Sequence, residues 1–471
     1  MKRLFFKPDY GWPADAIPYY DNGLFHIFYL LDYRNPEKHG EGTPWFKITT
    51  KDFVTYEDCG EMLARGTDKQ YDMYVFTGSV FKDADGVYHI WYTGHNTRMV
   101  ENYIQVVMHA VSRDLTHWEK VPEDTFGTLC GDYEIADWRD PFVWYDGESG
   151  VYKMLLSARK TSGPLNRRGA TILLVSRDNK KWEIEKPFWQ PDLYYAHECP
   201  DLFKIGDWYY HVFSEFSHRN LTRYVMSKSI DGPWIQPADD AFDGRAYYAA
   251  KTVSDGKDNY VIGWNPTREG ESDAGRWQWG GALVVHKLLQ RGDGTLACVM
   301  PETVENAFGG EMELTFRDGD GTPVNRIAAD TGGACTAYYA DTKAQETYLL
   351  DVEFTLGDCN SFGVLINADV RNDLSYGYIL YPQNGKITFG RFPDFPQGDY
   401  DARGLERPAK LNAGRHRLKI IVEEGICVAY LDDDCALGAR MYGKLTGVTG
   451  IMCQGEIEVN SIKIKTFKEK K

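Results

Sequence analysis

The sequence predicts an all-β protein in which residues 1–301 form a five-bladed β-propeller and residues 302–471 form a C-terminal β-sandwich. Three observations support this fold class: a turn motif that repeats along the first 301 residues, short apolar strands with turn residues between them, and the lack of helical periodicity. A chain of 471 residues is also longer than one hydrophobic core usually supports, which favours two domains.

The repeated turn motif consists of a small hydroxyl residue, a variable residue and an aspartate, with a bulky aromatic residue a few positions later. It occurs at 50–56, 112–118, 176–182 and 229–234, and its aspartates are 62, 64 and 53 residues apart. Regular spacing of this kind indicates a repeat architecture. We interpret each repeat as one propeller blade, because blades that close around an axis leave few exposed strand edges.

Each copy of the motif follows a short apolar strand, and an aromatic-rich strand lies upstream of that one. The upstream strands are expected at 24–31, 87–92, 151–158, 208–213 and 259–264, and the following strands at 46–49, 106–111, 172–175, 223–226 and 282–288. Asp-Gly and Asn-Gly pairs separate several of them. A tandem of β-sandwiches is the alternative, but it would not place the same turn at the same point of every unit.

The sequence changes character after Pro301. Residues 302–340 are rich in Gly and Asp, and strands are then expected at 347–356, 362–367, 376–381, 386–392, 415–423, 426–431 and 456–465. About seven alternating strands with turn signals are typical of a β-sandwich.

Composition excludes several functional classes. The net charge of −16 argues against a nucleic-acid partner, because binding to phosphates depends on Lys and Arg. We find no apolar run of membrane-spanning length and no signal peptide, so we expect a cytoplasmic protein with no membrane partner. The nine scattered cysteines form no C-x-x-C pair, which indicates reduced thiols and no metal site. The 14% aromatic content suits both strand packing and contact with sugar faces.

Three acidic residues stand beside apolar strands where blades begin. They are Asp15 at the first blade, Asp140 at the third and Glu198 at the fourth. Each one alone has an ordinary structural interpretation as a turn cap or an ion-pair partner. A propeller, however, gathers the innermost strand of each blade around one axis, so we expect these three side chains to converge. Arg139 is expected to favour the ionised form of Asp140.

Three converging carboxyl groups suit glycosidic bond cleavage. That reaction needs a proton donor with a raised pKa and a carboxylate on the other face of the sugar, and a third carboxylate can hold sugar hydroxyls. Such a mechanism requires no metal and no cofactor. His197, next to Glu198, is interpreted as a structural residue or one that tunes its neighbour.

Several sequence blocks resemble glycoside hydrolase family 32, the invertase, levanase and inulinase group. The most specific are Asp15, the triplet Arg139-Asp140-Pro141 and the run Glu198-Cys199-Pro200-Asp201. Other stretches are similar in the same order, at 12–15, 26–29, 76–79, 247–252, 263–264 and 418–440. The resemblance implies that Asp15 is the nucleophile, Glu198 the general acid/base and Asp140, with Arg139, the transition-state stabiliser. It also implies a pocket lined by Trp45, Phe76 and Ser79.

The resemblance implies retaining hydrolysis of terminal β-fructofuranosyl units from sucrose or fructo-oligosaccharides, without a cofactor. The chain departs from the family at 14–18, where Ala-Asp-Ala-Ile-Pro replaces Asn-Asp-Pro-Asn-Gly, and at Leu30, where the family has Gln. These changes remove polar groups around the acids. Two alternatives stay open. One is a related five-bladed enzyme that cleaves an arabinofuranoside or an unusual fructoside, with retention or inversion of configuration, and the other is a non-catalytic sugar-binding protein. A phosphorylated substrate would need cations, for which Arg98, Lys251 and Arg268 are candidates.

Overall fold

The computed structural model describes residues 2–99, 104–317, 322–324, 327–344, 346–394, 400–443 and 446–468. The chain forms two compact units. Unit 1 contains residues Met1–Ala241, Tyr247–Trp264 and Gly280–Thr295, and unit 2 contains Phe242–Ala246, Asn265–Trp279 and Leu296–Lys471. The single boundary expected after residue 301 stays a prediction.

Helices are few and short in the described residues. The two α-helices are α1 (Pro36–His39) and α2 (Glu302–Glu305). Single 3₁₀ turns lie at Tyr71–Met73, Thr97–Met99, Pro122–Asp124, Leu165–Arg167, Glu269–Glu271 and Pro382–Asn384. Among these described helices, none has the length and apolar character needed to cross a membrane.

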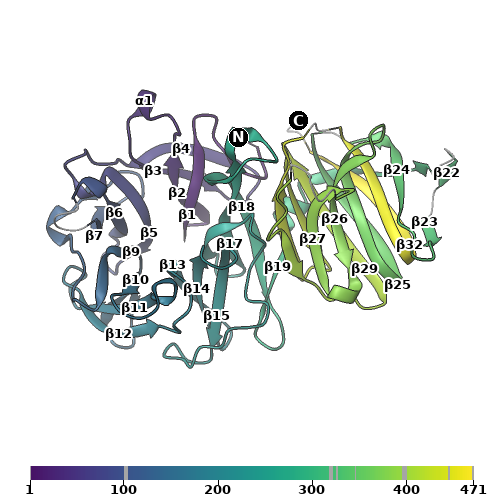
Figure 1. The fold of residues 1–471 in the computed structure, drawn as a ribbon. Helices are drawn as coiled ribbons and strands as arrows, with labels where there is room; N and C mark the ends of the chain where they lie inside the picture. The colour runs from purple at the N-terminus through teal and green to yellow at the C-terminus, as the bar shows by residue number, and fades with distance from the viewer. Residues whose placement is uncertain are drawn as a thin grey trace. The chain divides into compact units, whose positions relative to one another are not determined.

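Five antiparallel sheets build unit 1, as the sequence predicts (Figure 1). The first contains β1 (Trp12–Asp21), β2 (Leu24–Asp32), β3 (Trp45–Thr50) and β4 (Tyr56–Leu63), and the second β5 (Tyr74–Lys82), β6 (Tyr88–His95), β7 (Gln105–Ser112) and β8 (Glu119–Lys120). The third contains β9 (Tyr133–Asp146), β10 (Val151–Lys160), β11 (Gly169–Ser176) and β12 (Glu183–Trp189), and the fourth β13 (Glu198–Ile205), β14 (Trp208–Glu215) and β15 (Leu221–Ser227). The fifth contains β16 (Tyr248–Ser254), β17 (Asn259–Arg268) and β18 (Trp277–Gln290), and β19 (Leu296–Val299) follows along the chain.

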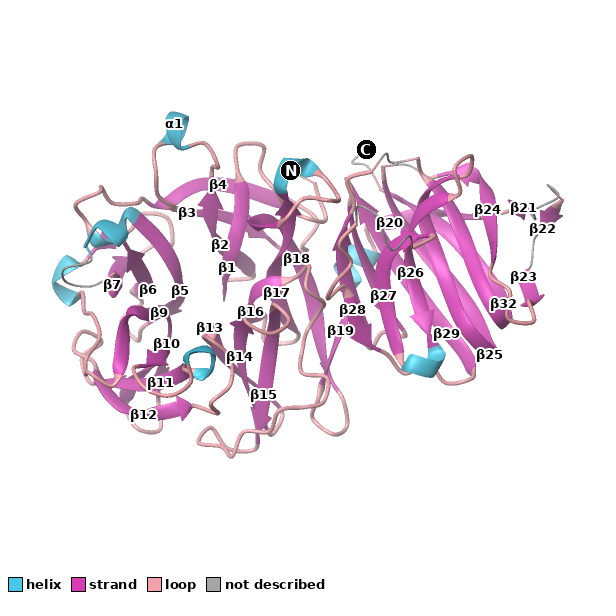
Figure 2. Ribbon diagram, in the orientation of Figure 1, coloured by secondary structure: helices cyan, strands magenta, loops and turns pink. Residues whose placement is uncertain are grey.

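The first strands of the five sheets close a ring. Strand β1 packs against β5, β5 against β9, β9 against β13, β13 against β16, and β16 against β1. This cyclic contact makes unit 1 a five-bladed β-propeller with these strands innermost, as Figure 2 also shows. The aromatic-rich strands predicted from the sequence are the second strand of each blade.

The repeated turn motif closes the third strand of the first three blades. In the second blade, the hydroxyl of Ser112 accepts hydrogen bonds of 3.1 Å from the backbone N–H groups of Asp114 and Leu115. The carboxylate of Asp114 then accepts bonds of 2.8 Å from the N–H groups of Thr116 and His117. Polar side chains that cap a turn in this way explain the repeat. The fourth copy begins at Ser229, two residues after the end of β15, so its position differs.

Every innermost strand contains a β-bulge. The register shifts between Pro13 and Ala16, Phe76 and Gly78, Glu198 and Asp201, and Tyr248 and Lys251; in blade three the shift falls within Arg139–Phe142. Asp140, Cys199 and Ala249 have positive φ angles of 61°, 51° and 49°. Because a bulge redirects the side chains beside it, five equivalent bulges aim residues from all five blades at the axis.

Unit 2 is also built of antiparallel strands. Its strands are β20 (Phe308–Glu313), β21 (Phe316–Arg317), β22 (Pro323–Val324), β23 (Ile327–Asp330), β24 (Thr336–Lys343), β25 (Thr347–Asp369), β26 (Leu374–Tyr381), β27 (Lys386–Phe392), β28 (Glu406–Pro408), β29 (Gly414–Glu423), β30 (Ile426–Leu431), β31 (Cys435–Arg440) and β32 (Val448–Phe467). They form one hydrogen-bonded network around one large apolar core. The strands expected at 347–356 and 362–367 are in fact one strand, β25, which continues through two register shifts around Cys359.

Candidate functional site

Asp15 lies in the bulge of β1 and is held by groups from three other blades. Thr77 donates a hydrogen bond of 2.5 Å to Oδ2, the indole Nε1 of Trp264 donates one of 3.0 Å to Oδ1, and Sγ of Cys199 lies 3.7 Å from Oδ2. Burial raises the pKa of Asp15, and the three donors oppose this rise because they favour the ionised form. The carboxylate is therefore enclosed and has a defined orientation.

Asp140 lies in the bulge of β9 and is buried. The backbone N–H of Cys199 donates a hydrogen bond of 2.9 Å to its Oδ2, and its own N–H donates one of 2.7 Å to Oγ1 of Thr93. Burial raises the pKa of Asp140 to about 7. Arg139, with Nε 3.7 Å from Oδ2, lowers this pKa as expected, but burial and the neighbouring Glu198 outweigh it.

Glu198 begins β13 and receives two donors. Nη2 of Arg139 lies 3.2 Å from its Oε1, and the hydroxyl of Tyr248 donates a hydrogen bond of 2.6 Å to its Oε2. Burial is the largest cause that raises the pKa of Glu198, and the charge of Asp15 adds to it. Arg139 and Tyr248 lower the pKa. A carboxyl group whose pKa is raised in this way is suited to general acid catalysis.

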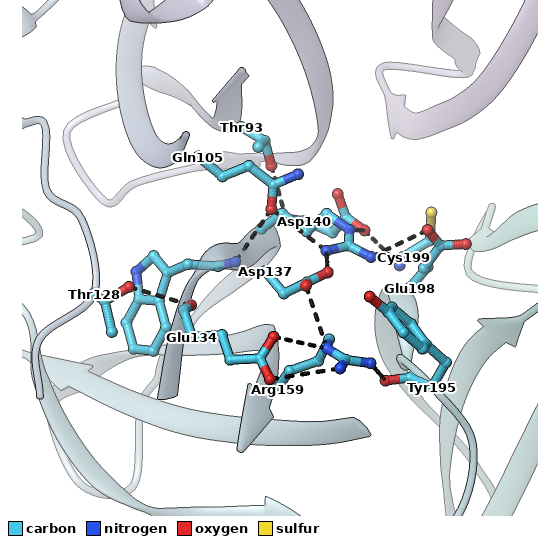
Figure 3. Close-up of polar contacts among 12 residues, drawn as sticks. Thr93, Gln105, Thr128, Glu134, Asp137, Asp140, Arg159, Tyr195, Glu198 and Cys199 are labelled. Atoms are coloured by element: carbon cyan, nitrogen blue, oxygen red, sulfur yellow. Dashed lines mark hydrogen bonds and ion pairs between the residues drawn. The ribbon is translucent and has the colours of Figure 1, made fainter. Parts of the chain in front are cut away.

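Arg139 connects these acids to a chain of ion pairs within blade three, in which Asp137, Arg159 and Glu134 take part (Figure 3). Its Nη1 contacts Asp137, whose Oδ2 lies 3.3 Å from Nε of Arg159. Arg159 in turn lies 3.1 Å from Glu134. The surrounding carboxylates raise the pKa of Arg139, so it stays charged.

The convergence expected from the sequence is therefore present. Asp15, Asp140 and Glu198 come from blades one, three and four, and one arginine contacts two of them directly. The charge of Asp15 raises the pKa of both Asp140 and Glu198, and Glu198 also raises the pKa of Asp140, so the three groups cannot all ionise easily. The site therefore favours a mixture of protonated and ionised carboxyl groups, as acid–base chemistry on a sugar requires.

The residues expected to line the pocket have different environments. The half-buried ring of Phe76 stacks on His95, with 4.9 Å between ring centroids. Trp45 is buried, and its Nε1 donates a hydrogen bond of 3.1 Å to the carbonyl of Phe76. Ser79 is also buried and accepts a hydrogen bond of 2.9 Å from the N–H of Val143. Trp45 and Ser79 thus support neighbouring strands, and their place in the pocket stays a prediction.

His197 and the candidate cations have partners other than the three acids. His197 is buried, its Nε2 lies 3.1 Å from the carbonyl of Leu193, and burial lowers its pKa to about 3. Arg98 pairs with Glu41 and Asp68, and Nζ of Lys251 donates to the carbonyl of Pro200 at 2.9 Å. Arg268 belongs to unit 2 and donates to the carbonyls of Asp273 and Asp401.

Sequence reasoning missed four residues that hold the acids: Thr77, Thr93, Tyr248 and Trp264. Thr77 and Tyr248 lie next to or within bulges of β5 and β16, at positions equivalent to Asp15 and Glu198. Both lie in stretches that resemble the family, but they carry no charge, and the alignment of the five bulges is what places them at the acids. Thr93 and Trp264 come from second strands, where their hydrogen bonds depend on tertiary packing.

Comparison with known proteins places this arrangement in a family. The model for the glycosyl hydrolases family 32 N-terminal domain matches residues 5–298. The chain is 27% identical over 319 residues to sucrose-6-phosphate hydrolase from Escherichia coli, a match covering 61% of this chain and 62% of that protein. It is 22% identical over 480 residues to levanbiose-producing levanase from Bacillus subtilis (strain 168), covering 91% and 84%. The match thus spans less than two thirds of the first relative's length.

Solved structures show the same fold over nearly the whole chain. Sucrose-6-phosphate hydrolase from Lactobacillus gasseri aligns with a TM-score of 0.76 at 17% identity and covers 97% of this chain and 91% of its own. Fructan 1-exohydrolase IIa from Cichorium intybus aligns with a TM-score of 0.76 at 14% identity and covers 100% and 99%. With the family model matched across the propeller and its three acids, the chain belongs to glycosyl hydrolase family 32.

Proposed function

We propose that this protein is a retaining β-fructofuranosidase that releases terminal fructosyl units from sucrose or fructo-oligosaccharides. The observation that carries the proposal is the group of Asp15, Asp140 and Glu198, enclosed at the propeller axis with raised pKa values. Relatives named as a sucrose-6-phosphate hydrolase, a levanase and a fructan exohydrolase support a fructosyl substrate.

In the first step, protonated Glu198 gives its proton to the glycosidic oxygen while Asp15 attacks the anomeric carbon. The bond to the leaving alcohol breaks, and an ester forms between Asp15 and the fructosyl group. The raised pKa of Glu198 keeps it protonated for this role. The donors from Thr77 and Trp264 favour the ionised form that Asp15 needs as a nucleophile.

In the second step, ionised Glu198 takes a proton from water, and the resulting hydroxide attacks the same carbon. The ester to Asp15 breaks, and fructose leaves with its original anomeric configuration. Asp140 is held by the N–H of Cys199 and is placed to bind hydroxyls of the fructosyl ring. Its carboxyl group can thereby stabilise the positive charge that develops on the sugar in the transition state.

The proposal is tested by incubating the protein with sucrose, inulobiose and levanbiose and measuring free fructose. We expect release from at least one substrate, with NMR showing retained configuration in the first-formed sugar. Glu198→Gln and Asp15→Asn should each lower kcat by about a thousandfold or more. No release from any fructoside by the wild-type protein would contradict the proposal.

A covalent intermediate gives a sharper test. β-D-Fructofuranosyl fluoride needs no acid to leave, so Glu198→Gln should complete the first step and stall at the second. Intact-mass spectrometry should then show one fructosyl group on the protein, and peptide mapping should locate it on Asp15. Asp15→Asn is the matched control and should gain no mass. An inverted product would instead favour the related inverting furanosidases, and sugar binding without turnover would favour a non-catalytic role.

A further inference from the structure

We propose that Tyr195 and Phe216 form the surface that binds the leaving group of the substrate, and that this leaving group is an uncharged sugar ring. The inference rests on the proposed function, because it names the part of the substrate that departs past the general acid. Neither residue belongs to the three acidic blocks, and both lie in segments that flank strands of blade four.

The position of Tyr195 places it beside the proton donor. The residue comes three positions before Glu198, in the segment that leads into β13. Figure 3 shows its ring beside Arg159, with the hydroxyl end directed toward Asp137. Since Glu198 protonates the glycosidic oxygen, the group bonded to that oxygen departs on the side of the site that Glu198 occupies.

The ring of Tyr195 is held in place before any ligand binds. The guanidinium carbon of Arg159 lies 3.4 Å from its ring centroid, and Nη1 of Arg159 donates a hydrogen bond of 2.8 Å to its carbonyl. Its own N–H donates one of 3.0 Å to Oγ of Ser217. A rigid aromatic surface loses little conformational entropy when a ligand binds, which favours affinity.

Phe216 extends this surface and is open to solvent. Its ring centroid lies 5.4 Å from that of Tyr195, and 45% of its surface is exposed. Arg159 also donates a hydrogen bond of 3.3 Å from Nη2 to the carbonyl of Leu165, which is 59% exposed. Exposed aromatic residues beside a polar site are suited to the C–H face of a sugar ring.

The charges at this surface favour a neutral ligand. The guanidinium of Arg159 pairs with Asp137 and Glu134, and Arg168 pairs with Glu134 at 2.9 Å. Both arginines already have carboxylate partners, so a phosphate placed here would have to displace an existing ion pair. An unphosphorylated sugar ring needs no such exchange.

The experiment compares two substrates that share the fructosyl group and differ in the leaving group: sucrose, which releases glucose, and methyl β-D-fructofuranoside, which releases methanol. Phe216→Ala should raise KM for sucrose by about tenfold, because it removes a stacking surface, and should leave kcat/KM for the methyl glycoside within about twofold. Phe216→Trp should restore the wild-type KM for sucrose. The control is Tyr145→Ala, which removes an aromatic residue that is 51% exposed at the far end of β9. It should change neither the KM for sucrose nor the kcat/KM for the methyl glycoside.

The outcomes separate the inference from the proposed function. If the wild-type protein hydrolyses neither substrate, the proposed function is wrong and the inference falls with it. If the wild type is active and Phe216→Ala affects both substrates equally, or neither, only the inference is wrong. Sucrose with a 6-phosphate on its glucose ring should have a lower kcat/KM than sucrose, and a higher value would overturn the assignment of an uncharged ligand.

Discussion

The hydroxyl of Tyr248 donates a hydrogen bond of 2.6 Å to Oε2 of Glu198 and links blade five to blade four at the propeller axis. Burial of Glu198 favours the protonated form and outweighs the charge of Arg139 and this hydrogen bond, which both favour the ionised carboxylate. Burial, together with the Glu198 carboxylate, raises the pKa of the Tyr248 phenol well above its ordinary value, which keeps the donor proton in place.

Tyr248→Phe should move the alkaline limb of the pH profile upward. Loss of the donor raises the pKa of Glu198 further, and Glu198 must be protonated for the first step. Because a hydrogen bond to a charged group contributes about 1.5–3 kcal/mol, we expect a shift of about one to two pH units in the alkaline limb of kcat/KM. Tyr145→Phe, at an exposed tyrosine, is the control. An unchanged alkaline limb would contradict the role of Glu198 as the acid.

Thr77→Val should move the acid limb of the pH profile to higher pH. The hydroxyl of Thr77 donates to Oδ2 of Asp15, and its removal raises the pKa of a carboxyl group that must be ionised to attack. The acid limb of kcat/KM should rise by about one pH unit while the alkaline limb stays in place. Measuring Tyr248→Phe and Thr77→Val on one substrate assigns the alkaline limb to Glu198 and the acid limb to Asp15. If Thr77→Val shifted the alkaline limb instead, the roles of Asp15 and Glu198 would have to be exchanged.

Asp140→Asn should stabilise the protein at neutral pH while it lowers activity. Burial raises the pKa of Asp140 from its usual 3.8 to about 7, so the folded state binds more protons than the unfolded state between these values. Stability therefore falls as pH rises from about 4 to 7, by at most about 4 kcal/mol from this group. Asparagine keeps an acceptor for the N–H of Cys199 and tolerates the positive φ angle.

Urea unfolding of Asp140→Asn and the wild-type protein at pH 5 and pH 8 measures this effect. We expect the midpoint difference between the two proteins to grow with pH. If the midpoint difference were the same at pH 5 and pH 8, titration of Asp140 would not be the cause of the stability difference between the two proteins. Loss of activity with unchanged fold at pH 8 would support its assignment to the site.

Gly78→Ala should destabilise blade two. Gly78 follows Thr77 in the bulge of β5, and a Cβ there would meet the backbone of Trp91 and Tyr92 on β6. Backbone cannot move aside as a flexible side chain can, so we expect a loss of about 1–3 kcal/mol and a fall in activity as Thr77 shifts. Gly147→Ala, where the added carbon meets open space, is the control and should leave the unfolding midpoint unchanged. Equal unfolding midpoints for Gly78→Ala and Gly147→Ala would contradict the close approach of position 78 to the backbone of β6.

The acidic blocks could be predicted from the sequence, but the residues that hold them could not. Asp140 and Glu198 are recognisable because a charge beside proline and apolar residues is unusual in a strand. Thr77, Tyr248 and Trp264 are ordinary strand residues, and their hydrogen bonds to the acids cross between blades. A contact between residues as far apart as 15 and 264 depends on ring closure, which no local pattern encodes.

By itself, the sequence determined the all-β class, the five-fold repeat and the three acids, because strand alternation, turn capping and spacing are local properties of the chain. Only the tertiary structure decided how the acids are tuned. The pKa of Asp140 and the donors to Asp15 and Glu198 follow from burial and from the bulge in each innermost strand, and both arise only when the five blades close around their axis.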